Sequence, residues 1–70
     1  MSKYEYTILD NKCNAYKKEF ISDSEAVSYI RKYWRDYIVS ITSNDQIWLY
    51  RPNKLLLATV NTSTGYVEVK

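Results

Sequence analysis

The sequence predicts an α+β fold: a single domain in which a twisted antiparallel sheet has one helix packed on one face. Between Ser22 and Tyr37 the large apolar side chains recur with the period of an amphipathic helix, and on either side of this segment they alternate as in strands. The connections between the expected strands are short, which favours antiparallel neighbours because a parallel pair needs a longer crossover. A chain of 70 residues cannot build two separate cores, so residues 1–70 are expected to form one domain in the order ββαββββ.

Two strands are expected before the helix. In residues 4–8, tyrosine and isoleucine alternate with polar side chains, and Asp10-Asn11-Lys12 then supplies turn residues. A second strand follows from roughly Cys13 to Phe20. Lys18 interrupts its apolar face, which indicates a position near an edge of the sheet.

The helix is expected to begin at a capping box, Ser22-Asp23-Ser24-Glu25, in which the serine hydroxyl and the glutamate satisfy free backbone amides. The apolar stripe expected to face the core consists of Ala26, Val27, Ile30, Tyr33, Trp34 and Tyr37. The opposite, solvent-facing side carries Ser28, Arg31, Lys32 and Arg35.

After the helix the period changes to two residues. The four expected strands are Ile38–Thr42, Gln46–Arg51, Leu55–Val60 and Tyr66–Val69. Turn-forming residues such as Pro52-Asn53 and Gly65 separate them, so these strands are expected to form an antiparallel meander.

The composition argues against most enzyme chemistry. The chain has no histidine, and its single cysteine, Cys13, has no partner for a disulfide or a catalytic pair and is expected to be buried. One glycine cannot build a phosphate-binding loop, which needs several closely approaching backbone amides. Asp36 and Asp45 could form a carboxylate pair, but a small domain rarely encloses the pocket that catalysis needs. A non-enzymatic protein without metal or cofactor is therefore expected.

The charge distribution is uneven although the net charge is only +2. Residues 1–30 contain four lysines and five acidic residues, a net charge of −1, whereas residues 31–70 contain six Lys and Arg and three acidic residues, a net charge of +3.

No apolar stretch approaches the roughly 20 residues of a membrane span, and the first residues lack an apolar signal segment. A cytoplasmic protein without membrane contact is expected.

Arg31, Lys32 and Arg35 form the first candidate binding surface. Solvated cations are normal opposite an apolar stripe, so these residues can simply form the solvent-exposed face of an amphipathic helix. Alternatively they form a cationic surface that binds phosphate groups or an acidic protein, since the planar guanidinium can donate hydrogen bonds to two oxygens at once. Residues on the hairpins that could extend this surface are Lys17, Lys18, Arg51 and Lys54.

Trp48 and Tyr50 form the second candidate. They alternate with Ile47 and Leu49 along one strand, so one pair must face the helix and the other must face away. If Trp48 and Tyr50 face away, together with Tyr4 or Tyr6 they could stack on bases or form a protein hot spot. The reverse arrangement, with Trp48 buried, is equally compatible with the alternation.

The length, the initial hairpin, the capped helix with its outer cations and the closing strands resemble small phage-encoded anti-CRISPR proteins, most closely a type I-F inhibitor. The matching parts are Tyr4–Ile8, Ser22–Tyr37 with its three cations, and Ile47–Tyr50. The resemblance rests on size, element order and composition. It implies a non-catalytic inhibitor, acting in the host cytoplasm, that binds a crRNA-guided ribonucleoprotein complex.

Three functions are expected in this order. The first is an inhibitor of a host protein or ribonucleoprotein complex that binds through Arg31, Lys32 and Arg35. The second is a small nucleic-acid-binding module with little sequence specificity. The third is a structural or assembly subunit, either a monomer or a homodimer in which a sheet edge pairs with its copy.

Overall fold

The computed structural model describes residues 2–37 and 46–70. The elements, in chain order, are β1 (Tyr4–Leu9), β2 (Ala15–Phe20), α1 (Asp23–Tyr33), the 3-10 helix η1 (Trp34–Tyr37), β3 (Gln46–Tyr50), β4 (Leu56–Asn61) and β5 (Tyr66–Val69). The predicted α+β class, with one α-helix and an antiparallel sheet, is confirmed. The strand expected at Ile38–Thr42 lies outside the described residues.

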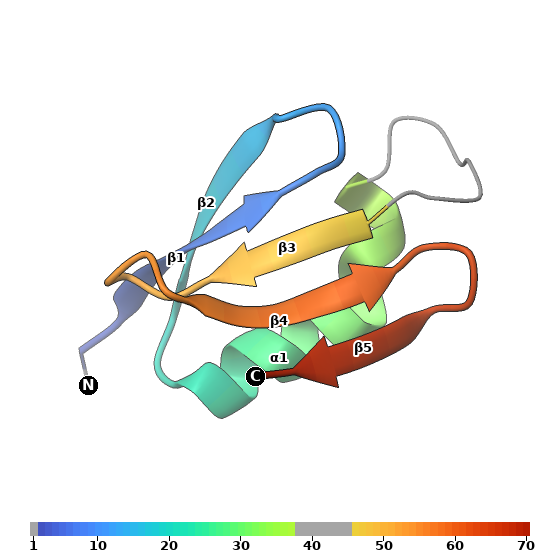
Figure 1. The fold of residues 1–70 in the computed structure, drawn as a ribbon. Helices are drawn as coiled ribbons and strands as arrows, with labels where there is room; N and C mark the ends of the chain where they lie inside the picture. Colours follow the sequence, from blue (N-terminus) through green and yellow to red (C-terminus); the bar gives the residue numbers. More distant parts are fainter. Residues whose placement is uncertain (1, 38–45) are drawn as a thin grey trace.

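The described strands form one antiparallel sheet in the order β2-β1-β3-β4-β5 (Figure 1). The chain leaves the sheet at β2, passes through α1 and η1, and returns as β3 on the other side of β1. β2 therefore lies at an edge, as Lys18 predicted. Hydrogen bonding between β1 and β3 joins the N-terminal hairpin to the C-terminal meander.

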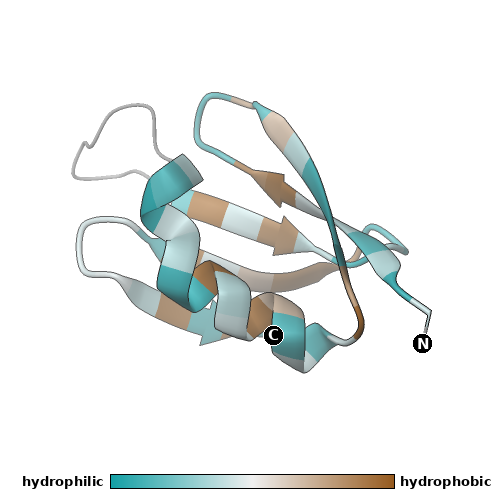
Figure 2. Ribbon diagram, turned by 180° about the vertical axis from the view of Figure 1, so that it is seen from behind, coloured by the Kyte–Doolittle hydropathy of each residue, from teal (hydrophilic) through white to brown (hydrophobic). Residues whose placement is uncertain are grey.

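The core lies between α1 and the sheet. The view from behind shows the helix crossing one face of the strands (Figure 2). The buried apolar residues are Tyr6, Ile8, Phe20, Ala26, Ile30, Trp34, Ile47, Leu49, Leu57, Ala58 and Val60. Alternate residues of the central strands thus face the helix, as expected for an antiparallel sheet covered on one side.

An irregularity in β4 breaks this alternation. Leu49 pairs with Ala58, whereas the next residue of β3, Tyr50, pairs with Leu56. Leu57 is therefore an extra residue, and both Leu57 and Ala58 are buried. Such a bulge bends the strand and strengthens its twist, which helps the sheet curve around the helix.

The predicted N-terminal cap of the helix is present with a small difference. Ser22 Oγ accepts a hydrogen bond of 3.2 Å from the amide of Glu25. The Glu25 carboxylate accepts 3.3 Å from the amide of Ile21, one residue before the position that a standard capping box uses. Both bonds satisfy amides near the start of α1.

The C-terminal end of the helical segment differs from the prediction. The α-helix ends at Tyr33, and the chain tightens into η1, whereas one helix to Tyr37 was expected. Trp34 is buried as predicted, at 8% exposure, but Tyr33 is 40% exposed, so its assignment to the buried stripe was wrong. In the described part of the chain, no helix is long and apolar enough to cross a membrane.

The turn between β1 and β2 is organised by Asp10, which is 1% exposed. One oxygen of its carboxylate accepts 2.9 Å hydrogen bonds from the amides of Lys12 and Asn14, and the other accepts from Asn14 Nδ2 at 3.0 Å. Cys13 occupies a left-handed backbone position (φ 66°) in this turn. Its side chain is exposed, so the expectation of a buried thiol was wrong.

Candidate binding surface on the helix

The outward side of α1 and η1 carries three exposed cations, Arg31, Lys32 and Arg35, here called the basic helix face. Arg31 and Lys32 lie in the last turn of α1, where free carbonyl groups give the helix end a partial negative charge that favours cations. Arg35 follows in η1. Because the same helix buries Ala26 and Ile30 against the sheet, the cations lie toward solvent, as the sequence predicted.

Two of these cations lie over neighbouring aromatic rings. Lys32 Nζ is 5.4 Å from the ring centroid of Tyr33, and Arg35 Cζ is 5.1 Å from that of Trp34. Such cation–π contacts at exposed sites contribute about 0.5–1 kcal/mol each. They restrict the side chains without neutralising the charges, so the cations remain available to an anionic partner.

The basic helix face does not take part in the ion pairs of the described chain. Among residues 2–37 and 46–70 the ion pairs are Glu5–Lys17, Asp23–Arg51 and Glu68–Lys70. The exposed Asp36, next to Arg35, reduces the local positive charge. The face nevertheless keeps an excess of positive charge.

The lysines of β2 point to opposite sides of the sheet. Lys18 lies on the helix side, with its Nζ 5.1 Å from the ring centroid of Tyr29, and adds positive charge to that side. Lys17 lies on the other side and is 3.9 Å from Glu5. Lys54 is exposed in the turn after β3, in a left-handed backbone conformation. Of the two neighbouring lysines, only Lys18 shares a side with the helix.

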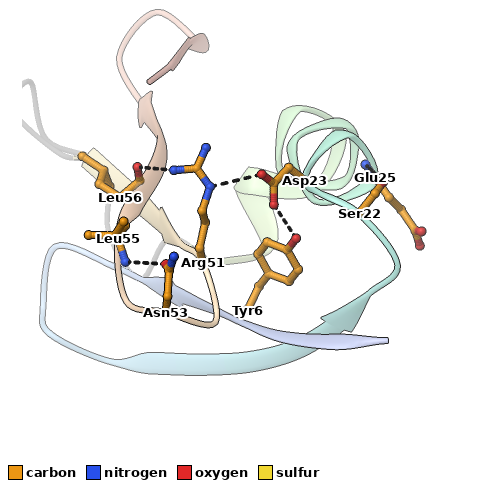
Figure 3. Close-up of polar contacts among 8 residues, drawn as sticks. All are labelled: Tyr6, Ser22, Asp23, Glu25, Arg51, Asn53, Leu55 and Leu56. Carbon is orange, nitrogen blue, oxygen red and sulfur yellow. Dashed lines mark hydrogen bonds and ion pairs between the residues drawn. The ribbon is translucent and has the colours of Figure 1, made fainter. Parts of the chain in front are cut away.

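Arg51 has a structural role (Figure 3). Its Nε donates 3.1 Å to Asp23 Oδ2, and its Nη1 donates 3.4 Å to the carbonyl of Leu56. The hydroxyl of Tyr6 donates 2.5 Å to the other oxygen of Asp23. These contacts join β1, the start of α1, the turn after β3 and the start of β4, so the Arg51 charge is largely occupied within the fold.

The shared carboxylate explains the pKa shifts in this network. Burial and the hydrogen bond to Asp23 raise the pKa of Tyr6 from 10.0 to about 12. The hydrogen bond from Tyr6, supported by the Arg51 guanidinium, holds the pKa of Asp23 below its usual value, against the opposing effect of partial desolvation. The network is therefore most stable with a neutral tyrosine and an ionised aspartate.

Trp48 and Tyr50 lie on the side of the sheet opposite the helix. Ile47 and Leu49 are 0% and 1% exposed in the core, so the alternating residues Trp48 and Tyr50 point away from it and are half-buried. The sequence left both arrangements open. Tyr6 is buried on the helix side, and Tyr4, which alternates with it, also belongs to that side, so neither joins Trp48.

A tyrosine cluster between β2 and the helix was missed. Tyr29 OH and Tyr37 OH are 2.6 Å apart, and Tyr37 also contacts Tyr16 with ring centroids 5.0 Å apart. Burial and the hydrogen bond to Tyr29 raise the pKa of Tyr37. The contact crosses the change from α1 to η1, so the spacing of an ideal α-helix did not reveal it.

Comparison with known proteins finds no matching family model, no matching curated protein and no matching solved structure. Within the described ranges, no group of three or more Cys, Asp or Glu residues could hold a metal ion, and no pocket is found. Asp45, considered above as a carboxylate partner of Asp36, lies outside these ranges.

Proposed function

We propose that the chain is a non-enzymatic binding protein whose contact surface is the basic helix face. The observation that carries this proposal is that Arg31, Lys32 and Arg35 are exposed and lie outside the ion pairs of the described residues, whereas Arg51 and Lys17 are paired. Cations that the fold does not neutralise fit a partner that presents phosphate groups or carboxylates.

Three features of the basic helix face and its surroundings support binding to an anionic surface. Arginine can bind two oxygens at once through its planar fork, and the ring contacts of Lys32 and Arg35 limit the side-chain entropy lost on binding. Lys18, on the same side of the sheet, extends the positive charge toward β2.

The proposed target is a host defence ribonucleoprotein, inhibited in the manner of the small anti-CRISPR proteins that the sequence resembles. This target class rests on the resemblance alone. The net charge of +2 fits contact with acidic protein or with nucleic acid held in such a complex better than it fits mimicry of DNA.

Binding to free nucleic acid has less support. Trp48 and Tyr50 lie on the opposite side of the sheet from the basic helix face, so bases cannot stack on them while the same short strand contacts Arg31 or Arg35. With three phosphate contacts alone, the logarithm of the binding constant falls with the logarithm of the salt concentration with a slope of about −2.7. The affinity would then fall roughly 40-fold between 50 and 200 mM salt.

The test is capture of a partner from a lysate of the native host, with and without nuclease, by the wild type and by Arg31→Glu/Arg35→Glu. We expect a complex that survives nuclease treatment and is lost with the double variant. Lys54→Glu is a control for charge reversal outside the basic helix face, because Lys54 is exposed in the turn after β3, and it should capture as well as the wild type. Equal capture by the double variant would refute the proposed surface.

A further inference from the structure

The side of the sheet that α1 leaves uncovered carries an apolar centre. The six half-buried residues at this centre, here called the open sheet face, are Thr7, Leu9, Trp48, Tyr50, Leu56 and Thr59. Strand register places them in two rows. Leu9 and Thr59 flank Trp48, while Thr7 and Leu56 flank Tyr50. In the described parts of the chain, no element lies in front of this face (Figure 1).

This face differs from an ordinary solvated face, on which polar side chains alternate with the buried ones. Here Leu9, Trp48, Tyr50 and Leu56 lie beside one another across three adjacent strands. Large aromatic side chains at the centre of a patch, here each with a leucine beside it on a neighbouring strand, are typical of a protein contact. Such an arrangement buries the aromatic rings when a second apolar surface covers them.

The charged rim of the face is largely neutralised within the chain. On one side, Lys17 Nζ is 3.9 Å from Glu5, and on the other, Lys70 Nζ donates 2.7 Å to Glu68. Register places Glu5 and Lys17 on the side of Thr7, and Glu68 opposite Thr59. The rim therefore does not favour a strongly charged partner, in contrast to the basic helix face.

We propose that the occupant of the open sheet face is a second copy of the chain, packed sheet against sheet. The counterpart must be apolar at its centre and nearly neutral at its rim, and the face itself meets both requirements. Two sheets stack in this way about 10 Å apart when their inner side chains interdigitate. This arrangement differs from the edge-to-edge pairing that the sequence suggested.

The area of the open sheet face determines how strong the dimer is expected to be. Five strands about 4.8 Å apart and about five residues long cover roughly 20 Å by 17 Å, well below the ~800 Å² per partner of a typical stable complex. Each copy also has its own core. The dimer is therefore reversible and forms at high concentration, while the monomer remains folded.

Such a dimer would place α1 of each copy on an outer side, because α1 covers the opposite face of each sheet. The two basic helix faces would then point in opposite directions. The association does not depend on the proposed function, since none of the residues of the open sheet face belongs to the basic helix face.

The test is the molecular mass in solution by sedimentation equilibrium between about 10 µM and about 1 mM, a range chosen for a weak interface. We expect the wild-type mass to rise from 8.3 kDa toward twice that value. Thr59→Lys, which introduces a charge at the centre of the face, should stay at the monomer mass. Ser28→Lys introduces the same charge on the outer side of α1 and should dimerise as the wild type does.

A wild type that remains at 8.3 kDa throughout, or a folded Thr59→Lys variant that dimerises normally, would overturn the proposal. Acrylamide quenching of tryptophan in the wild type provides a readout that needs no variant. Trp34 is buried in the core, whereas Trp48 lies in the proposed interface, so quenching should fall as the protein is concentrated. Dimer formation with unchanged quenching would point to a different contact and would also overturn the proposal.

Discussion

Arg51 and Asp23, which are 28 residues apart in the sequence, are joined by a 3.1 Å hydrogen bond between oppositely charged groups. Tyr6 donates to the same carboxylate, so one aspartate at the start of α1 binds a side chain from β1 and one from the turn after β3. The contact separates the cations of this protein by role. Arg51 holds the helix to the sheet, while Arg31 and Arg35 lie at its outer side.

Arg51→Gln should lower the free energy of unfolding by about 1 kcal/mol, because it removes a charge-assisted hydrogen bond that is partly exposed and therefore weakened by solvent. Urea unfolding followed by far-UV circular dichroism measures the change. Lys54→Gln, at an exposed turn position, should stay within about 0.5 kcal/mol of the wild type. Equal stability of the two variants would contradict the structural role of Arg51.

Tyr6 predicts a loss of stability at alkaline pH. Its folded pKa of about 12 lies above the ordinary value of 10.0, because burial and the bond to Asp23 favour the neutral phenol. The stabilisation is thus complete below pH 10.0 and is lost as the pH rises through about 12. In Tyr6→Phe, the free energy of unfolding should fall less steeply over this interval. Identical slopes for the two proteins would refute the assignment.

Asp10 predicts a loss of stability in acid. Burial alone would raise its pKa, but hydrogen bonds from Asn14, Lys12 and Tyr16 outweigh this effect and lower it below the ordinary value of 3.8. The stabilisation is present above pH 3.8 and is lost as the pH falls through the lowered pKa.

Asp10→Asn should cost about 2 kcal/mol at neutral pH, because the amide nitrogen cannot accept the bonds that a carboxylate oxygen accepts. Its free energy of unfolding should also depend less on pH below 3.8 than that of the wild type. The remaining dependence comes partly from Asp23, whose pKa is lowered as well. An unchanged acid profile would show that the Asp10 network does not stabilise the turn.

Cys13 should react with a thiol reagent in the native protein as fast as a free cysteine does, because its side chain is exposed in the turn after β1. The measurement is the rate of labelling at neutral pH without denaturant. Labelling that requires urea would mean that the thiol is buried, as the sequence alone suggested.

Local pattern was sufficient for much of the fold. The capping residues and apolar spacing located α1, and the alternation of residues 4–8 and 46–50 located β1 and β3. The interrupting charge at Lys18 correctly placed β2 at an edge. Each of these signals depends on neighbours in the sequence, which is why it could be read without the structure.

The features that were missed depend on long-range contacts. Alternation shows that Ile47 and Trp48 face opposite sides, but only the packing of α1 determines which side is buried. The extra residue Leu57 in β4 has no local signal, because its neighbours are also apolar. Arg51 was expected at the binding surface because its partner, Asp23, is distant in the sequence.

The position of the candidate surface could be predicted from the sequence, but its detailed contacts could not. Helical spacing placed Arg31, Lys32 and Arg35 on the solvent side, and their exposure agrees with this. The ring contacts of Lys32 and Arg35 could not be anticipated, because each joins adjacent residues, whose side chains do not face each other on an ideal helix.

The most direct test of the outward basic helix face is the free energy of unfolding of Arg31→Gln/Arg35→Gln in urea. Since Arg31 takes no part in the ion pairs of the described residues and Arg35 contributes one exposed cation–π contact, we expect a decrease of about 1 kcal/mol or less. A decrease of about 3 kcal/mol or more, the size seen when a buried ion pair is broken, would contradict it and show that these arginines hold the fold together.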